Sequence, residues 1–264
     1  MVLKLLDMKL RIIILAAMGC LSLLARGESP QVIAHRGYWQ VEGSAQNSIR
    51  SLVTADSIGC YGSEFDVWMT ADSVLVVNHD AEFRGVDIQN SPSDKVLALR
   101  LDNGESLPTL DALFEAAKSL NTRLICELKV HDSRSREKTA VSAILAKAHD
   151  YGLEDRMEYI TFSPQAFSEF IRLAPKGTPV YYLNGDFIPA QIEYMHGAGI
   201  DYYIETLRKH PEWIADCHKR GLKLNAWTVD KPEDMKWCID NGIDFITTNR
   251  PKILQNLIKA YQNE

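Results

Sequence analysis

Charged residues two positions apart occur in two short segments of the chain that otherwise have the character of strands. Glu64 and Asp66 flank Phe65 in the run SEFDV, and Glu127 and Lys129 flank a leucine in the run ELK. Residues two apart on a strand point to the same side, so both pairs project into one space. Three carboxylates meeting there repel one another unless a cation lies among them, and an all-oxygen ligand set favours Ca²⁺ or Mg²⁺. The alternative is neutralisation by structural ion pairs.

Two of the seven histidines end apolar runs beside these carboxylates. His35 follows the run VIA, and His79 follows the run VVN. Imidazole titrates near neutral pH, so two histidines beside a cation can divide general-base and general-acid catalysis. We therefore predict an acid/base pair, with packed or solvated imidazoles as the alternative. The other histidines are expected to be packed or solvated: His131, His149, His196, His210 and His218.

The elements that must position these residues alternate between strand and helix. Short apolar runs with strand character occur at residues 32–34, 64–67, 123–127, 158–162, 180–183, 202–205, 223–229 and 245–247. Segments with helical periodicity separate them. Eight such units in this length predict a closed (β/α)8 TIM barrel rather than an open doubly wound sheet. The carboxylates and histidines then fall at the C-terminal ends of strands, where barrel enzymes carry their sites.

A small insertion is expected after the second strand. Residues 74–77 lie too close to that strand for a crossover helix, so they should return antiparallel beside it. Residues 81–109 are polar and contain a proline, and they are predicted to form an irregular surface segment.

The first 27 residues have the pattern of a secretory signal peptide. The apolar segment 12–25 is too short to span a bilayer comfortably, and basic residues precede it. Ala25 and Gly27 predict cleavage after residue 27, which leaves one barrel domain over residues 28–264. The product would be secreted or periplasmic, without stable membrane insertion. Lipoprotein processing at Cys20 and an uncleaved anchor are the alternatives.

The composition is that of an ordinary globular protein, with 46% hydrophobic and 24% charged residues. The net charge is −6 and becomes more negative without the basic leader, which argues against a nucleic-acid partner. The cysteines after the leader lack metal-site or thioredoxin spacing. Packed free thiols are expected, with a bond between Cys217 and Cys238 as the alternative. No pattern indicates an oligomeric state.

Several short motifs together resemble the glycerophosphodiester phosphodiesterase family. They are HRG at 35–37, QNS at 46–48, EFDV at 64–67, HD at 79–80, LPTL at 107–110, ELK at 127–129, WTV at 227–229 and GIDFITTNRP at 242–251. The resemblance implies a TIM barrel that uses Ca²⁺ or Mg²⁺ to hydrolyse glycerophosphodiesters to glycerol 3-phosphate and an alcohol. The expected partner is therefore a small-molecule glycerophosphodiester.

The resemblance also implies a role for each matching residue. The metal ligands would be Glu64, Asp66 and Glu127, the acid/base pair His35 and His79, the phosphate-binding cations Arg36 and Lys129, and the aromatic wall beside glycerol Trp227. In the implied mechanism one histidine helps a glycerol hydroxyl of the substrate attack phosphorus, and the other protonates the leaving alcohol. Water then opens the cyclic phosphate. Phe162 and Tyr182 are expected either to add apolar walls or to pack.

Two positions depart from the family pattern. Gln46 stands where the family usually has glutamate, and Asn249 stands where it tends to have aspartate. A neutral amide still forms hydrogen bonds but lends no negative charge to a nearby cation or histidine. We therefore expect changed catalytic efficiency or substrate choice.

Two other functions stay open on the sequence. A phospholipase-like relative that cleaves lyso- or intact lipids would need an exposed apolar rim, and the polar residues 81–100 favour soluble substrates instead. A non-catalytic protein that binds phosphate esters would retain the site without turnover.

Overall fold

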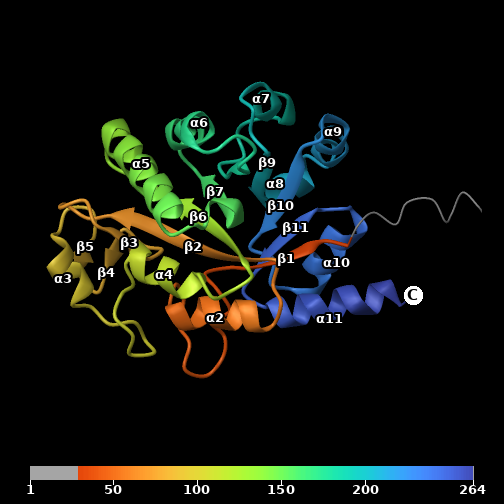
Figure 1. Ribbon diagram of the computed structural model, residues 1–264. Helices are drawn as coiled ribbons and strands as arrows, with labels where there is room; N and C mark the ends of the chain where they lie inside the picture. Colours follow the sequence, from red (N-terminus) through yellow and green to blue (C-terminus); the bar gives the residue numbers. More distant parts are fainter. Residues whose placement is uncertain (1–28, 264) are drawn as a thin grey trace, which may run out of the picture.

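The computed structural model describes residues 29–263 (Figure 1). The predicted leader and Cys20 lie outside the described residues. Eight parallel strands follow one another around a barrel, and pairing between β1 and β2 closes it. The predicted (β/α)8 barrel is therefore confirmed. Its strands are β1 (Gln31–Ala34), β2 (Gly62–Met69), β6 (Arg123–Leu128), β7 (Met157–Thr161), β8 (Val180–Tyr182), β9 (Gly199–Tyr203), β10 (Lys223–Trp227) and β11 (Phe245–Thr248).

Helices surround this barrel (Figure 1). They are α2 (Ile49–Ser57), α4 (Leu110–Ala117), α5 (Arg134–Asp150), the 3₁₀ turn η1 (Glu154–Arg156), α6 (Pro164–Leu173), α7 (Pro189–Tyr194), α8 (Ile204–Lys209), α9 (Glu212–Arg220), α10 (Pro232–Asp240) and α11 (Pro251–Gln262). Ser48, Thr109, Ser133 and Ser163 cap four of them by accepting a backbone N–H of the first turn. Among residues 29–263, no helix combines the length and the apolar character needed to cross a bilayer.

The largest displacement of a predicted strand concerns the sixth strand of the barrel. The segment expected at 202–205 is β9, which runs from Gly199 to Tyr203, and Ile204 already begins α8. Gly199 fits there because a Cβ would lie 2.0 Å from the carbonyl oxygen of Lys223 on β10. The strand therefore starts at a glycine that the apolar pattern does not register.

Alternation along the strands divides the core into two layers. The barrel interior is closed by large side chains: Ile33, Ile125, Ile160, Tyr181, Leu183 and Phe245. The opposite faces of the same strands pack against the helices, as Tyr159 stacks on Phe170. The cysteines of residues 29–263 are buried and free, as expected.

The insertion after β2 has its own small core. As predicted, β3 (Leu75–Val77) returns antiparallel beside β2. The expectation of an irregular segment at 81–109 was wrong, because β4 (Glu82–Phe83), β5 (Val86–Asp87) and α3 (Ser93–Leu97) form there. These elements bury apolar residues that are scattered among polar ones, including Val86, Ile88 and Val96. In Figure 1 the insertion extends past the end of β2, so it borders the C-terminal mouth of the barrel.

Candidate active site

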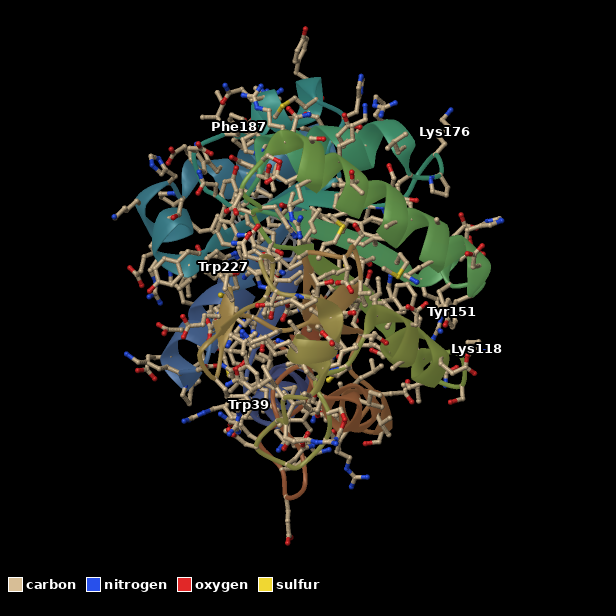
Figure 2. All side chains as sticks on the ribbon, turned by 90° about the vertical axis from the view of Figure 1, so that its left-hand side faces the viewer. Trp39, Lys118, Tyr151, Lys176, Phe187 and Trp227 are labelled. Carbon is tan, nitrogen blue, oxygen red and sulfur yellow. The ribbon has the colours of Figure 1, made fainter. Side chains whose placement is uncertain are left out.

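The sequence-predicted site residues meet at the C-terminal mouth of the barrel, which faces the viewer in Figure 2. A cavity of about 110 Å³, here called the site cavity, lies there. Its walls include His35, Arg36, Glu64, His79, Glu127, Lys129 and Trp227. Asp66 is 1% exposed and pairs in register with Glu127 on the adjacent strand. The structure therefore brings all eight residues together, and their chemical roles remain predictions.

Glu64, Asp66 and Glu127 form an acidic cluster whose ligand oxygens lie within 4.8 Å of one another. Burial raises the pKa of Glu64 well above its ordinary value and that of Glu127 to about 7, and the charge of Asp66 adds to both shifts. Glu64 Oε1 is buried and has no hydrogen-bond partner among residues 29–263. An oxygen without a partner in a set of three carboxylates fits a hard divalent cation.

Basic groups neutralise part of this cluster. Lys129 Nζ lies 3.2 Å from Asp66 Oδ1 and 2.7 Å from Glu127 Oε1, and Arg36 Nε lies 3.8 Å from Asp66 Oδ2. Although burial works in the opposite direction, Lys129 brings the pKa of Asp66 below its ordinary value. These ion pairs thus offset the negative charges of Asp66 and Glu127. Within residues 29–263, the Glu64 carboxylate accepts a single hydrogen bond, from the backbone N–H of Arg36 to Oε2 at 2.7 Å.

The His35 ring is held by an amide. Its Nδ1 lies 2.9 Å from Asn249 Oδ1, and the amide nitrogen of Asn249 donates to Asp230 Oδ2 at 2.7 Å. This fixes the amide so that its oxygen faces the ring, and Nδ1–H is then the donor. Burial lowers the pKa of His35 to about 4, and the charge of Arg36 adds to this shift. The ring is therefore neutral at pH 7 with the lone pair on Nε2.

His79 has a different partner, because its Nδ1 lies 2.7 Å from Asp80 Oδ1. Burial lowers the pKa of His79, while the charge of Asp66 and the bond to Asp80 oppose that shift. Both candidate histidines thus line one cavity, and Nδ1 contacts a neutral amide in His35 and a carboxylate in His79.

Aromatic rings line the opposite wall of the site cavity. Trp227 packs edge-on against Phe162 with ring centroids 5.6 Å apart, and its indole N–H donates to the carbonyl oxygen of Asp201 at 2.8 Å. Tyr182 does not join this wall. It points outward into the helix layer, because side chains alternate along β8, and Leu183 lines the cavity instead.

Two polar residues at the site were missed in the sequence. Asn47 donates to Asp66 Oδ2 at 2.8 Å and accepts from the Asp66 backbone N–H at 3.1 Å. Its backbone is left-handed, with φ 58°, a conformation that asparagine tolerates. Asp201 lines the site cavity and is 2% exposed, and burial raises its pKa to about 8. The sequence signal for Asp201 would have been an acidic residue within a strand. The predicted strand began at residue 202 and therefore left Asp201 out.

The Gln46 amide lies behind Arg36. Its Oε1 accepts from Arg36 Nη1 at 2.6 Å, and the guanidinium separates it from Asp66. Gln46 therefore acts on the acidic cluster only through Arg36.

A barrel that gathers carboxylates, imidazoles, a lysine and an arginine at one cavity has the group set of a phosphate-ester hydrolase. The glycerophosphoryl diester phosphodiesterase family model matches residues 34–253, and the chain belongs to this family.

Relatives match over nearly the whole chain. A glycerophosphodiester phosphodiesterase of Caldanaerobacter subterraneus is 29% identical over 86% of this chain and 97% of its own. A crystal structure of a glycerophosphodiester phosphodiesterase from Parabacteroides distasonis has 47% identity and a TM-score of 0.88, covering 89% of this chain and all of the other. A phosphodiesterase structure from Oleispira antarctica, in complex with the product sn-glycerol-3-phosphate, shares the fold at 22% identity and a TM-score of 0.74, covering 88% of this chain and 97% of its own.

Proposed function

We propose that this protein hydrolyses glycerophosphodiesters to glycerol 3-phosphate and an alcohol with the help of one divalent cation. The convergence of the acidic cluster, both histidines, Arg36 and Lys129 on the site cavity carries this proposal. The names of the relatives and the product-bound Oleispira antarctica structure support the same substrate class.

His35 is the candidate general base. Its Nδ1 is engaged by Asn249, so Nε2 is the atom that accepts a proton, and the low pKa keeps it unprotonated at neutral pH. A glycerol hydroxyl of the substrate gives up its proton to Nε2 as its oxygen attacks phosphorus. Water then opens the resulting cyclic phosphate.

His79 is the candidate general acid for the leaving alcohol. Asp80 holds its Nδ1–H and stabilises the imidazolium, so Nε2 is the position from which a proton reaches the leaving oxygen. Arg36 and Lys129 line the same cavity and attract the phosphate charge. Each removed donor at comparable sites costs roughly 10²–10³ in turnover.

The acidic cluster is the proposed holder of Ca²⁺ or Mg²⁺. Three carboxylates against Lys129 and the more distant Arg36 leave excess negative charge, and Glu64 Oε1 has no partner among residues 29–263. A bound cation would polarise the phosphate oxygens and neutralise the charge that develops on them.

The test is release of glycerol 3-phosphate from glycerophosphocholine, glycerophosphoethanolamine, glycerophosphoglycerol and glycerophosphoinositol, with and without EDTA. We expect turnover that EDTA abolishes and that added Ca²⁺ or Mg²⁺ restores. Turnover that resists chelation would contradict the cation proposal. Ligand binding without any turnover would instead support a non-catalytic phosphate-ester binding protein.

One observation favours cleavage of lyso-lipids as a second candidate function. Exposed apolar side chains lie at or after the C-terminal ends of β6, β8 and β9, with Val130 at 50%, Ile188 at 47% and Tyr203 at 49% exposure. A lyso-lipid needs apolar surface of this kind beside the site. Comparison of lysophosphatidylcholine with glycerophosphocholine tests it, and a preference for the acylated substrate would support the lipid function.

We further propose that residues 1–27 direct the protein out of the cytoplasm and are then removed. The support is their basic and apolar pattern and the small residues before the predicted cleavage point. The mass of the mature N-terminus in fractionated cells tests this. Residue 28 as the first residue supports a secreted or periplasmic protein, and a lipidated Cys20 supports the lipoprotein alternative.

A further inference from the structure

A second cavity, here called the neighbouring cavity, adjoins the site cavity. Its volume is about 520 Å³, and its walls come from residues 39–47 between β1 and α2 and from residues 78–80, 83 and 101–102 of the insertion. Arg36 and His79 line both cavities. The mechanism described above uses these two side chains but leaves the larger of the two spaces without a role.

A phosphodiester carries two alcohol arms on one phosphorus atom. If the phosphate lies at Arg36 and His79, the two arms leave it in different directions, and two cavities meet at that point. The site cavity, with its aromatic wall, has room for one small arm. We propose that the neighbouring cavity binds the leaving alcohol and selects a small amino alcohol with a positively charged nitrogen. This inference rests on the proposed phosphodiesterase function.

The charges around the neighbouring cavity select a cation. Its walls carry the carboxylates of Glu42, Asp80 and Asp102, and the groups in these walls that carry positive charge are Arg36 and, when protonated, His79. Arg36 already faces Asp66 and Gln46, and Asp102 is paired with Arg84 at 2.9 Å. Asp80 is paired with His79. Glu42 is therefore the acidic residue in these walls that has no ion pair within residues 29–263.

Aromatic side chains in the same walls suit an ammonium group. The guanidinium of Arg84 lies 5.4 Å from the ring centroid of Phe83, so one of these rings already binds a cation. Trp39 is the other, and its indole N–H donates to Asn249 Oδ1 at 3.0 Å, which fixes the ring plane. Quaternary and primary ammonium groups are attracted to indole faces as well as to carboxylates.

His79 lies at the border of the neighbouring cavity, where it can protonate an alcohol that leaves into that cavity. The bond between phosphorus and the leaving oxygen breaks as the new bond from the glycerol hydroxyl forms, and the leaving oxygen takes one proton. His79 borders the neighbouring cavity and supplies that proton, whereas His35 lines only the site cavity. The proton that His35 removes from the glycerol hydroxyl balances the step.

The experiment compares kcat/KM for glycerophosphocholine and for glycerophosphoglycerol, two substrates that differ only in the leaving arm. We expect a preference of about 10-fold for the cationic arm, from one aromatic face and one exposed carboxylate. Choline should also inhibit as a product more strongly than glycerol does. Equal kcat/KM values, or a preference for the neutral arm, would overturn the proposal.

Variants of Glu42 test the wall directly, because this exposed residue takes no part in the catalytic machinery. Glu42→Gln should reduce the preference about 2- to 5-fold, and Glu42→Lys should abolish it by repulsion. Activity on glycerophosphoglycerol should stay unchanged in both. Asp150→Asn and Asp150→Lys provide matched charge changes at an exposed residue where α5 ends, and they should leave the preference intact.

The outcomes separate this inference from the function on which it rests. If no substrate releases glycerol 3-phosphate, the proposed function fails. If all are cleaved but Glu42→Lys leaves the ratio of kcat/KM values unchanged, only the leaving-group inference fails. A loss that is equal for both substrates would assign Glu42 a merely structural role and would overturn the inference as well.

Discussion

The acidic cluster on β2 and β6 and Asp201 on β9 place carboxyl groups inside the same barrel, where burial penalises charge. In the acidic cluster, Lys129 and Arg36 keep Asp66 ionised and Glu64 has an oxygen without a partner. Asp201 Oδ1 also has no hydrogen-bond partner among residues 29–263, but Asp201 pairs in register with the neutral Asn225, and burial raises its pKa to about 8, which leaves it protonated at neutral pH.

This difference separates three carboxyl groups that need positive charge nearby from one that stays neutral. A neutral acid needs only hydrogen-bonding neighbours, whereas three close carboxylates need cations. The histidines follow the same division. His131 is buried with a pKa lowered to about 4, and both ring nitrogens have backbone partners, Met69 N–H on Nε2 and the Lys129 carbonyl oxygen on Nδ1.

The largest predicted effect compares Glu64→Gln with Asp201→Asn. Glu64→Gln removes a proposed cation ligand, so turnover of glycerophosphodiesters should fall about 1,000-fold. Asp201→Asn replaces a neutral acid with a neutral amide, so turnover should change by less than about 3-fold. Steady-state assays at saturating Ca²⁺ or Mg²⁺ measure both. Equal losses would break the distinction between the two regions.

Substitution of the histidines should give the next largest effect. His35→Ala and His79→Ala should each lower kcat about 100-fold or more, because each removes a proton-transfer group. His131→Gln serves as the control and should lower the melting temperature while kcat stays within about 3-fold of the wild type. Near wild-type turnover in either alanine variant would exclude that histidine from the mechanism.

Asn249→Asp tests how the amide sets the basicity of His35. With its pKa near 4, His35 stays unprotonated until the pH falls below about 5, so His35 should set the acid limb of kcat/KM, while loss of the His79 proton should set the limb at higher pH. A carboxylate at 249 would stabilise the imidazolium, and the acid limb should move up by about one pH unit. The pH profile of kcat/KM measures the shift. An unchanged acid limb would mean that His35 is not the group titrated.

The pH dependence of stability should distinguish the two carboxyl groups without any activity assay. The pKa values of Glu127, about 7, and Asp201, about 8, lie above those of the unfolded chain. The folded protein therefore holds protons that the unfolded chain has lost. The stability of the metal-free protein should fall as the pH rises from about 4.5 to about 8, by about 1.4 kcal/mol per pH unit for each such proton.

Ca²⁺ should cancel only the part of this slope that comes from the acidic cluster, because the cation replaces protons there. Asp201→Asn should remove the other part and leave the Ca²⁺ effect intact. Melting temperatures in EDTA and in Ca²⁺ across that pH range measure both contributions. A slope that Ca²⁺ leaves unchanged would contradict a cation site in the cluster.

Much of the fold could be predicted because each unit of the barrel repeats one local pattern. The apolar runs and the capped helices between them identify the strands without long-range information. The core of the insertion could not be predicted in this way, because Val86, Ile88 and Val96 are single apolar residues among polar ones. Only their packing against Trp68 and Leu107 shows that they belong together.

The candidate site likewise contains residues that could be predicted from the sequence and residues that could not. The pairs Glu64 and Asp66, and Glu127 and Lys129, were predicted because strand spacing alone aims them at one space. The bond from Asn47 to Asp66 joins a loop to a strand, and the bond from Asn249 to His35 joins the loops that follow β11 and β1. No local periodicity encodes such contacts. The groups proposed to do the chemistry could therefore be predicted from the sequence, while the groups that contact them from other loops required the structure.

Gln46→Glu should give the smallest effect of these substitutions. It tests how a charge behind Arg36 changes the attraction of the acidic cluster for a cation. Gln46 accepts from Arg36 Nη1 at 2.6 Å, so a carboxylate there would compete with Asp66 for the guanidinium and add one negative charge behind it. Both effects favour a cation at the cluster, and Ca²⁺ should bind about 2- to 5-fold more tightly. Gln40→Glu adds the same charge at an exposed residue of the same loop. If it tightens Ca²⁺ binding equally in calorimetric titrations, the gain is general attraction and Arg36 does not transmit it.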